Sequence, residues 1–305
     1  MTHRNFKSVQ IPLLLALLLL SGALLSTANA QQTDEPLRII AFGAHPDDCE
    51  INAAGVGALW AAAGHAFKCV SMTNGDIGHF GESGGALALR RMEEVNACHE
   101  HLGTTGEVMD IHDGELMPTL ENRRKVANKI REWQADIVMV HRRYDYHADH
   151  RYSGVLVDDA IILVEAPYFA LDTPPLPKSP VVLYYHDGFE RPYPFQADLV
   201  VDIDQTADLK ADCLKEMPSQ FSDVDSWTYG RSDEVPATEE ERMNRRVGNL
   251  MQRYSGQADQ YRNRLVDLYG ESRASGVEYA ESFELSQYGR RASEEELKAL
   301  FPTFD

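Results

Sequence analysis

The sequence has few cysteines, and none of them lie at a metal-binding or redox spacing. Four cysteines occur among 305 residues, and no two of them form a C-x-x-C motif. This excludes a small scaffold built from disulfides and gives no support to a zinc ribbon or a thioredoxin-like redox pair. The pattern leaves their state open, because Cys49, Cys69, Cys98 and Cys213 could pair in an oxidising compartment or remain as buried thiols.

Positive charge is also scarce. Lysine and arginine number 29 against 48 aspartates and glutamates, which gives a formal net charge of −19. An anionic surface repels phosphate backbones, so we expect no nucleic-acid partner. The apolar share of 43% and the charged share of 25% are typical of globular proteins and exclude a disordered chain. The sequence contains no internal repeat and no low-complexity tract.

The N-terminal apolar run is too short to span a bilayer, which takes about 20 residues. It covers residues 11–25, follows the basic residues Arg4 and Lys7, and precedes Ala28-Asn29-Ala30. A basic start, an apolar stretch and a small-x-small site are the parts of a signal peptide. We therefore predict a signal peptide over 1–30 that is cleaved after Ala30 and a leader over 31–36. The expected location is periplasmic or secreted, with no stable membrane anchor after cleavage.

Beyond residue 36, short apolar runs alternate with helical patterns. This β-α order implies right-handed crossovers and a mostly parallel sheet with helices on both faces. We predict an α/β, Rossmann-like catalytic domain over 37–215, and a helical C-terminal extension over 216–305 packed on the same domain. The expected strands are 37–44, 67–73, 108–111, 137–141, 181–186 and 199–203, and the main helices of the domain are 52–63, 86–102 and 119–133.

Two polar clusters follow expected strands, and we interpret them as one site. Residues 45–48 (His-Pro-Asp-Asp) follow the first strand, and residues 145–150 (Asp-Tyr-His-Ala-Asp-His) follow the fourth. These strands are neighbours across the switch point in the usual order of such sheets, so the clusters should face each other. His45, Asp48 and His150 then form a mixed nitrogen and oxygen set that suits zinc, or ferrous iron as a two-His-one-carboxylate face.

The remaining polar groups of the clusters suit hydrolysis. A divalent metal with an open position makes hydroxide available at neutral pH. Asp47 lies beside the ligands and suits a general base, while His147 could polarise a carbonyl or protonate a leaving amine. Ferrous oxygenases with such a face usually have all-β folds, so the β-α alternation favours zinc hydrolysis by analogy.

These motifs resemble the PIG-L/LmbE family of zinc-dependent de-N-acetylases. The resemblance implies a Rossmann-like fold, one zinc ion and removal of an N-acetyl group from an amino sugar or glycoconjugate of the N-acetylglucosamine type. It rests on A-H-P-D-D at 44–48, H-x-D-H at 147–150, Thr73-Asn74-Gly75-Asp76, Arg91-x-x-Glu94 with Leu102-Gly103, Asp113-Gly114 and Ser219-Gln220.

The resemblance also implies a role for each matching residue. His45, Asp48 and His150 resemble the zinc ligands. Asp47 resembles the general base and His147 the histidine that stabilises the oxyanion. Asp149 would orient a neighbouring histidine, and Arg91 resembles a residue that contacts the substrate.

Departures from the family pattern leave the substrate open. Ala148 stands where the family often has proline, and Met217 where many members have histidine. The alternatives are a zinc amidase for another amide, such as a thiol conjugate or an acylated small molecule, and a non-catalytic carbohydrate-binding relative.

Some residues also have a structural interpretation. Arg91 and Glu94 could form a simple exposed ion pair. His186 could reach the site or be structural. Four other histidines are expected at the surface or at helix ends: His65, His99, His101 and His112.

Overall fold

The computed structural model describes residues 35–304. The predicted signal peptide and most of the predicted leader lie outside this range. The chain from Pro36 onward forms one compact unit. None of its described helices combines the length and the apolar character that a bilayer crossing requires.

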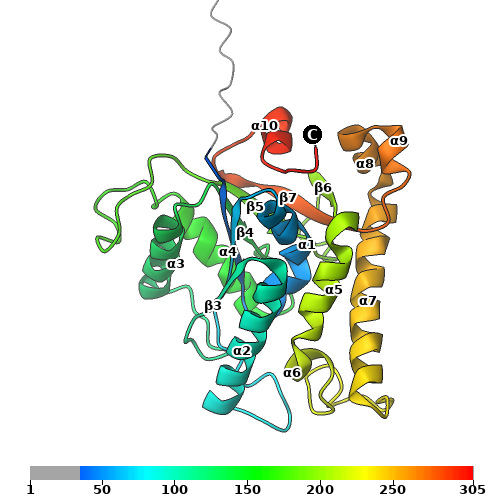
Figure 1. Ribbon diagram of the computed structural model, residues 1–305. Helices are drawn as coiled ribbons and strands as arrows, with labels where there is room; N and C mark the ends of the chain where they lie inside the picture. Colours follow the sequence, from blue (N-terminus) through cyan, green and yellow to red (C-terminus); the bar gives the residue numbers. More distant parts are fainter. Residues whose placement is uncertain (1–34, 305) are drawn as a thin grey trace, which may run out of the picture. The chain divides into compact units, whose positions relative to one another are not determined.

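A seven-stranded sheet in the order β3-β2-β1-β4-β5-β7-β6 runs through the molecule (Figure 1). The five strands from β3 to β5 are parallel, whereas β7 is antiparallel to both of its neighbours. The predicted α/β fold with a mostly parallel sheet is confirmed, and β1 and β4 are adjacent at the switch point. The strands are β1 (Arg38–Gly43), β2 (Ala66–Ser71), β3 (Thr105–Val108), β4 (Ile137–Val140), β5 (Val181–Tyr185), β6 (Leu199–Asp202) and β7 (Ala280–Gly289).

Helices cover both faces of the sheet (Figure 1). α3 and α4 pack on one face, and α1 and α10 pack on the other. α5 packs beside α1 and α2, α7 packs on α5 and β7, and α8 packs on β6. The helices are α1 (Asp48–Ala62), α2 (Gly85–Leu102), α3 (Leu120–Trp133), α4 (Ala148–Ile161), the 3-10 helix η1 (Asp204–Thr206), α5 (Ala207–Lys215), α6 (Pro218–Phe221), α7 (Glu239–Gln260), α8 (Arg262–Tyr269), α9 (Glu271–Ala274) and α10 (Glu294–Ala299).

Strand β1 explains why the early apolar run forms a central strand. Successive side chains of a strand point to opposite faces, so Ile39 and Ala41 join the core under α1 while Ile40 and Phe42 join the core under α3 and α4. A strand segment that is buried on both faces needs apolar residues at every position, and residues 39–42 are Ile-Ile-Ala-Phe. β1 thereby carries the loop that follows it to the carboxyl edge of the sheet.

The C-terminal region is not purely helical, because it supplies β7. We expected a helical extension from residue 216 onward and missed this strand, although Phe283 and Leu285 alternate with polar residues as strand residues do. The polar residues are buried with partners. The Glu281 carboxylate accepts hydrogen bonds from the N–H groups of Gly55 and Val56 in α1 and from Lys210 Nζ, at 3.0, 2.9 and 2.5 Å. These tertiary partners allow a polar strand inside the sheet.

Helix α1 begins four residues earlier than expected. We placed its start near residue 52, but it starts at Asp48, directly after the Asp47 N-cap. Asp48 and Glu50 therefore lie in the first turn of the helix, where negative charge interacts favourably with the helix dipole. This start fixes Asp48 on a rigid element rather than in a loop.

Candidate metal centre and active-site pocket

The end of β1 holds the Asp48 carboxylate in one orientation. Its Oδ2 accepts hydrogen bonds from the backbone N–H groups of Ala44 and His45, at 2.9 and 2.8 Å. The loop passes so close that a Cβ on Gly43 would lie 2.8 Å from the Asp48 Cβ. A glycine is required there because any side chain would push Asp48 away. The other oxygen, Oδ1, faces the second polar cluster.

His45, Asp48 and His150 meet as the sequence predicts. His45 Nδ1 lies 3.3 Å from Asp48 Oδ2, His150 Nε2 lies 3.3 Å from Asp48 Oδ1, and the two histidine nitrogens are 3.2 Å apart. Ligand atoms at 2.0–2.1 Å from a tetrahedral zinc ion are about 3.3 Å apart. The three side chains therefore have the spacing and the donor types of a divalent metal site.

His141 belongs to the same cluster, and sequence reasoning missed it. It follows β4 directly, is buried, and stacks on the His150 ring at a centroid distance of 4.2 Å. His141 Nε2 lies 3.3 Å from Asp48 Oδ2 and has no hydrogen-bond partner among the described residues. Its position at the carboxyl end of a strand could have indicated a site residue. We assigned it to the strand and not to the site.

Carboxylates behind the histidines orient the rings. Asp145 Oδ1 lies 3.1 Å from His150 Nδ1, which leaves His150 Nε2 for the centre. Asp113 Oδ1 lies 3.1 Å from His45 Nε2, and Asp149 Oδ2 lies 3.5 Å from the same nitrogen. Asp149 also accepts backbone N–H bonds from the loop after β3. Asp145 and Asp113 lie in two of the sequence motifs, residues 145–150 and Asp113-Gly114, but the sequence alone had not suggested a role in the site for either.

Asp47 is held in a backbone conformation that few residues adopt. Its φ is 152° and its carboxyl group is buried beside the centre. L side chains rarely adopt this φ, and such strain is common at functional sites. Burial, followed by the charge of Asp48, raises the pKa of Asp47 to about 7.

His147 is the N-cap of α4, and this role sets its tautomer. Its Nδ1 accepts a hydrogen bond from the Asp149 N–H at 3.2 Å, so the proton of the neutral ring is on Nε2. Burial and then the charges of His45 and His150 lower the pKa of His147 below its ordinary value of 6.5. A neutral ring with an Nε2–H is a hydrogen-bond donor at the pocket.

Arg91 is buried and lines the pocket, so the simple exposed ion pair with Glu94 does not form. Arg91 Nη2 donates to Gly78 O at 2.9 Å and to Gln220 Oε1 at 2.6 Å. Glu94 instead accepts from the Ser219 N–H and hydroxyl, at 3.0 and 2.5 Å. The R-x-x-E and Ser-Gln motifs thus bond to each other across the pocket wall.

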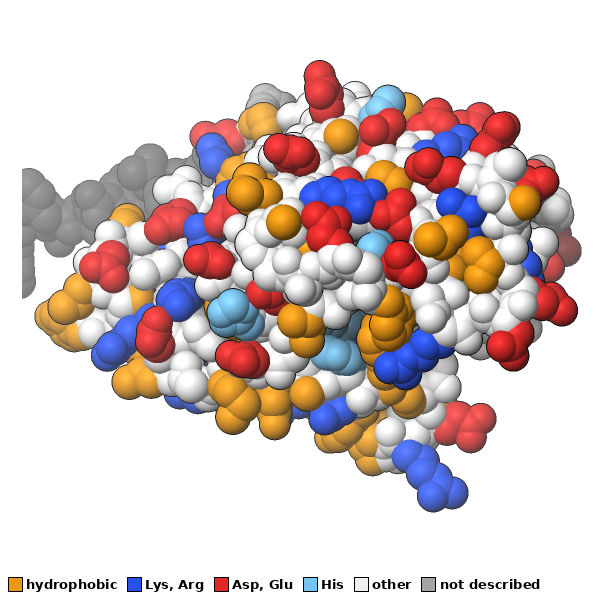
Figure 2. Space-filling model, turned by 90° about the horizontal axis from the view of Figure 1, so that it is seen from below, with side chains coloured by type: hydrophobic (Ala, Val, Ile, Leu, Met, Phe, Trp, Pro, Cys, Tyr) orange, Lys and Arg blue, Asp and Glu red, His pale blue; other side chains and the backbone are white. Residues whose placement is uncertain are grey.

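The centre lies at the base of a pocket of ≈ 590 Å³. Its walls come from the loops after β1, β2, β3 and β4, from the chain after β5, from the segment after α6, and from α7. Seen from below, this face has a hollow where histidine side chains are visible beside hydrophobic and basic ones (Figure 2). Trp227 on the rim is 54% exposed and stacks on Phe80 at a centroid distance of 5.4 Å.

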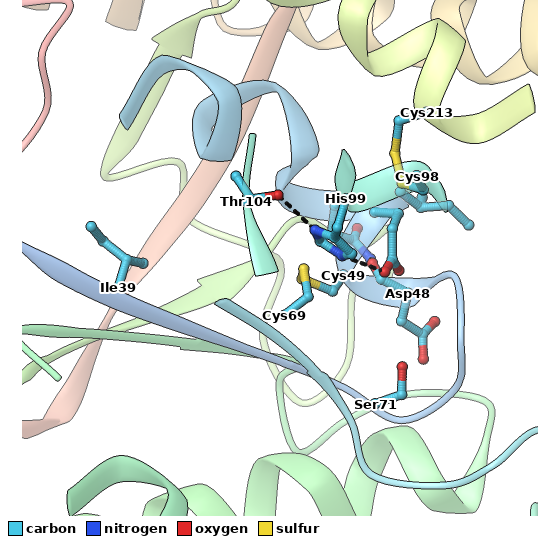
Figure 3. The surroundings of a disulfide bond; sticks show 12 residues. Ile39, Asp48, Cys49, Cys69, Ser71, Cys98, His99, Thr104 and Cys213 are labelled. Carbon is cyan, nitrogen blue, oxygen red and sulfur yellow. Dashed lines mark hydrogen bonds and ion pairs between the residues drawn. A yellow bond between two sulfur atoms is a disulfide. The ribbon is translucent and has the colours of Figure 1, made fainter. Parts of the chain in front are cut away.

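All four cysteines are paired in disulfides. Cys49 of α1 is bonded to Cys69 of β2, and Cys98 of α2 is bonded to Cys213 of α5 (Figure 3). His99 lies beside the first disulfide in the last turn of α2, so it is at a helix end as expected, but it is buried and not at the surface. Its two ring nitrogens bond Thr104 and Glu50, and these partners are what keep an imidazole inside the core.

Comparison with known proteins adds three findings. A family model described as PIG-L, GlcNAc-PI de-N-acetylase, matches residues 40–161. The diacetylchitobiose deacetylase of Thermococcus kodakarensis is 30% identical over 203 residues, which is 62% of this chain and 72% of that protein. The N,N'-diacetylchitobiose deacetylase from Pyrococcus horikoshii, solved with its inhibitor MPG, has a TM-score of 0.62 at 24% identity, covering 81% of this chain and 83% of that one.

The fold is also similar to that of a protein with different chemistry. GalB, the 4-carboxy-2-hydroxymuconate hydratase of Pseudomonas putida KT2440, has a TM-score of 0.66 at 21% identity, covering 85% of this chain and 99% of that one. At this level of identity the likeness extends to the fold alone. The reaction must therefore be argued from the site.

Proposed function

This chain belongs to the PIG-L family of de-N-acetylases and is a hydrolytic N-deacetylase, and we propose that it is an exported, zinc-dependent enzyme that removes acetate from an amino sugar of the chitobiose type. The observation that carries the proposal is the triangle of His45 Nδ1, Asp48 and His150 Nε2, with sides of 3.2–3.3 Å. These separations are those expected of ligand atoms that converge on one divalent ion.

His45, Asp48 and His150 would hold the metal. His141 is a further donor, and it lies within ligand spacing of Asp48 and His150. When bound, the metal supplies Lewis acidity and lowers the pKa of coordinated water to about 7. The mixed nitrogen and oxygen donors suit zinc, and ferrous iron fits the same donors. The carboxylates Asp145 and Asp113 fix the ring orientations on which this donor set depends.

The side chains around the centre suit amide hydrolysis. Asp47 takes a proton from the attacking water as its oxygen adds to the acetyl carbonyl carbon. Asp47 is buried beside the centre, where its carboxylate accepts this proton and can return it. His147 Nε2–H donates a hydrogen bond to the carbonyl oxygen as negative charge develops there. The proton held by Asp47 passes to the leaving nitrogen as the C–N bond breaks, giving acetate and a free amine.

The other residues position these groups and the substrate. Asp149 holds the loop after β3 and the outer nitrogen of His45, and its backbone N–H fixes the His147 tautomer. Arg91 contacts the sugar from the pocket wall, where its buried Nε has no hydrogen-bond partner among the described residues. The diacetylchitobiose deacetylases similar to this chain support an N-acetylated sugar as substrate.

Export rests on the N-terminal sequence and on the disulfides. Residues 1–30 have the three parts of a signal peptide, and four paired cysteines are typical of an oxidising compartment. We expect the purified mature protein to begin at Gln31. We also expect its intact mass to fall about 4 Da below that of the reduced chain, since each disulfide removes two hydrogens. A chain that still begins at Met1, or contains free thiols, would count against export.

Acetate release from N-acetylated sugars tests the catalytic proposal. The zinc-loaded mature protein is compared with the variant Asp47→Asn, and Asp212→Asn, an exposed carboxylate on α5, is the control. Loss of a general base reduces turnover by roughly 10²–10⁴-fold, and we expect this in Asp47→Asn with one zinc still bound. Equal release by Asp47→Asn and wild type would exclude Asp47 as the base. No release from any sugar by zinc-loaded wild type would overturn the proposed substrate class.

A further inference from the structure

A second cavity adjoins the active-site pocket through Arg142. Its volume of ≈ 620 Å³ is close to the ≈ 590 Å³ of the active-site pocket, and the two share none of their described lining residues. Arg142 lines the active-site pocket, and its Nη1 donates at 3.2 Å to Glu284 Oε2, which belongs to the second cavity. The residues that line this cavity come from the end of β5, the chain between β5 and β6, and the second half of β7 with the residues after it: Tyr184, Tyr193, Gln196, Asp198, Glu284, Leu285, Gln287, Tyr288 and Arg291.

Two exposed tyrosines line this cavity, and neighbouring arginines hold their rings in place. Tyr193 is 39% exposed and Tyr288 is 45% exposed. The guanidinium carbon of Arg142 lies 5.0 Å from the Tyr193 ring centroid, and that of Arg143 lies 4.5 Å from the Tyr288 ring centroid. Such cation–π contacts restrict the motion of both rings. A side chain that is ordered before a ligand arrives loses less entropy on binding, so these rings suit a stacking surface.

Two carboxylates of the cavity are held in fixed orientations. Glu284 is buried, and its Oε2 accepts from Arg142 and from the Gln196 N–H, at 3.2 and 2.9 Å. Asp198 Oδ2 accepts the Leu285 N–H at 2.8 Å. An ionised carboxylate has about four acceptor sites, so both groups can still accept a hydrogen bond from a ligand.

These lining groups favour an uncharged polar ligand. An apolar ligand would cover Asp198 and Glu284 without forming hydrogen bonds to them, which costs free energy. An anion would be repelled by the same two carboxylates. A cation would find Glu284 already paired with Arg142, and it would meet the Arg291 guanidinium in the same wall. A neutral molecule that both donates and accepts hydrogen bonds avoids all three costs.

We propose that this cavity is a second binding site, separate from the metal centre, for a neutral sugar. The C–H face of a pyranose ring packs on a tyrosine ring. Its hydroxyl groups donate to the two carboxylates and accept from the exposed side-chain amides of Gln196 and Gln287. The volume lies within the range of about 300–1,000 Å³ that is typical of small-molecule sites. The inference stands apart from the proposed deacetylase function, because no residue of the metal centre lines this cavity.

Ligand-observed NMR titration measures sugar binding without any turnover. The probes are methyl β-glucoside, methyl β-glucuronide and methyl β-glucosaminide, which have no acetyl group to remove and differ only in charge. Each is titrated into the zinc-loaded mature protein. We expect the neutral glucoside to bind more tightly than the anionic glucuronide and the cationic glucosaminide, because only the neutral ring avoids both the carboxylates' repulsion and the Arg291 charge.

Substitution locates the bound sugar in the cavity. Tyr193→Ala and Tyr288→Ala should each weaken binding of the glucoside by roughly 10-fold, because each removes a stacking surface. Tyr288→Phe keeps the ring and should bind as the wild type does. Tyr168→Ala removes a tyrosine that is 90% exposed and lies outside the cavity, so it is the matched control and should change nothing.

Three results would overturn the second site: no binding of the glucoside, equal binding of all three glycosides, or glucoside binding that survives both alanine substitutions. Acetate release from N-acetylated sugars is measured on the same proteins, and we expect Tyr288→Ala to equal the wild type. Loss of glucoside binding with unchanged acetate release would support two separate sites. Absence of acetate release in every protein would reject the deacetylase proposal and leave this binding site standing.

Discussion

Two acidic residues in the first turn of α1 have opposite environments, although they are only two positions apart. Asp48 faces the pocket, where nitrogens of His45, His141 and His150 all lie 3.3 Å from its oxygens. Glu50 faces the core, where its Oε1 bonds His99 Nε2 at 2.9 Å. Residues two apart on a helix point about 200° apart, so the two side chains extend from opposite sides of the same helical turn.

The histidines beside these two carboxylates differ in whether their ring nitrogens have hydrogen-bond partners. Each ring nitrogen of His99 has a protein partner, because Thr104 bonds the second one at 2.6 Å. His141 Nε2, beside Asp48, has none among the described residues. Glu50, Cys69 and His99 lie as close together as metal ligands do, yet the Cys69 sulfur is committed to the disulfide with Cys49. Proximity of donors is therefore not sufficient by itself, because the donor atoms must also be free of other bonds, as they are around Asp48 and not at Cys69.

Removing the Asp48 carboxylate should have the largest effect. We expect Asp48→Ala to weaken zinc binding by well over ~100-fold, because even the outer partners of metal ligands contribute about 10–100-fold. Deacetylation should fall with it. Metal content after dialysis and acetate release measure the two effects. A variant that keeps one equivalent of zinc and its activity would place the metal elsewhere.

The equivalent change at Glu50 should affect folding and leave the metal in place. Glu50→Ala leaves His99 buried without its acceptor, which typically costs about 3 kcal/mol of the free energy of unfolding. Urea unfolding measures the loss, and Glu100→Ala, an exposed position on α2, is the control. Zinc content should stay at one equivalent. Loss of zinc in Glu50→Ala with unchanged stability would reverse the assignment of the two clusters.

The sequence was sufficient to predict the two clusters and where they meet. His45, Asp48 and His150 follow strands β1 and β4, and parallel topology brings the carboxyl ends of those strands to one edge. What it could not predict depends on tertiary partners. β7 is polar in sequence and becomes a strand because Glu281 and its neighbours find partners in other elements. His141 directly follows β4, and its contacts with Asp48 and His150 identify it as part of the cluster.

The same reasoning explains why α7 was overlooked as part of the pocket. Its sequence indicates a charged, amphipathic helix with a capped start, and the capping box of Thr238 and Glu241 is present. Arg245 and Arg246 are equivalent by composition. The packing of α7 against the rest of the chain decides that Arg246 lines the pocket and Arg245 is exposed. Such a distinction requires the helix rotation, which a charge pattern alone does not fix.

His186 extends the comparison to acid stability and should give the smallest effect. Unlike His99, its Nδ1 has no partner among the described residues, and burial and then Arg253 and Arg142 lower its pKa to about 4. The unfolded chain protonates the His186 ring below about pH 6.5, whereas the folded chain does so only near pH 4.

The stability contributed by neutral His186 is therefore complete above pH 6.5 and is lost as the pH falls toward 4. At pH 5 the loss is about 2 kcal/mol relative to pH 8. Urea unfolding of wild type and His186→Gln at both pH values isolates the contribution of His186 to the free energy of unfolding. An equal pH dependence in the two proteins would mean that folding leaves the His186 pKa unchanged.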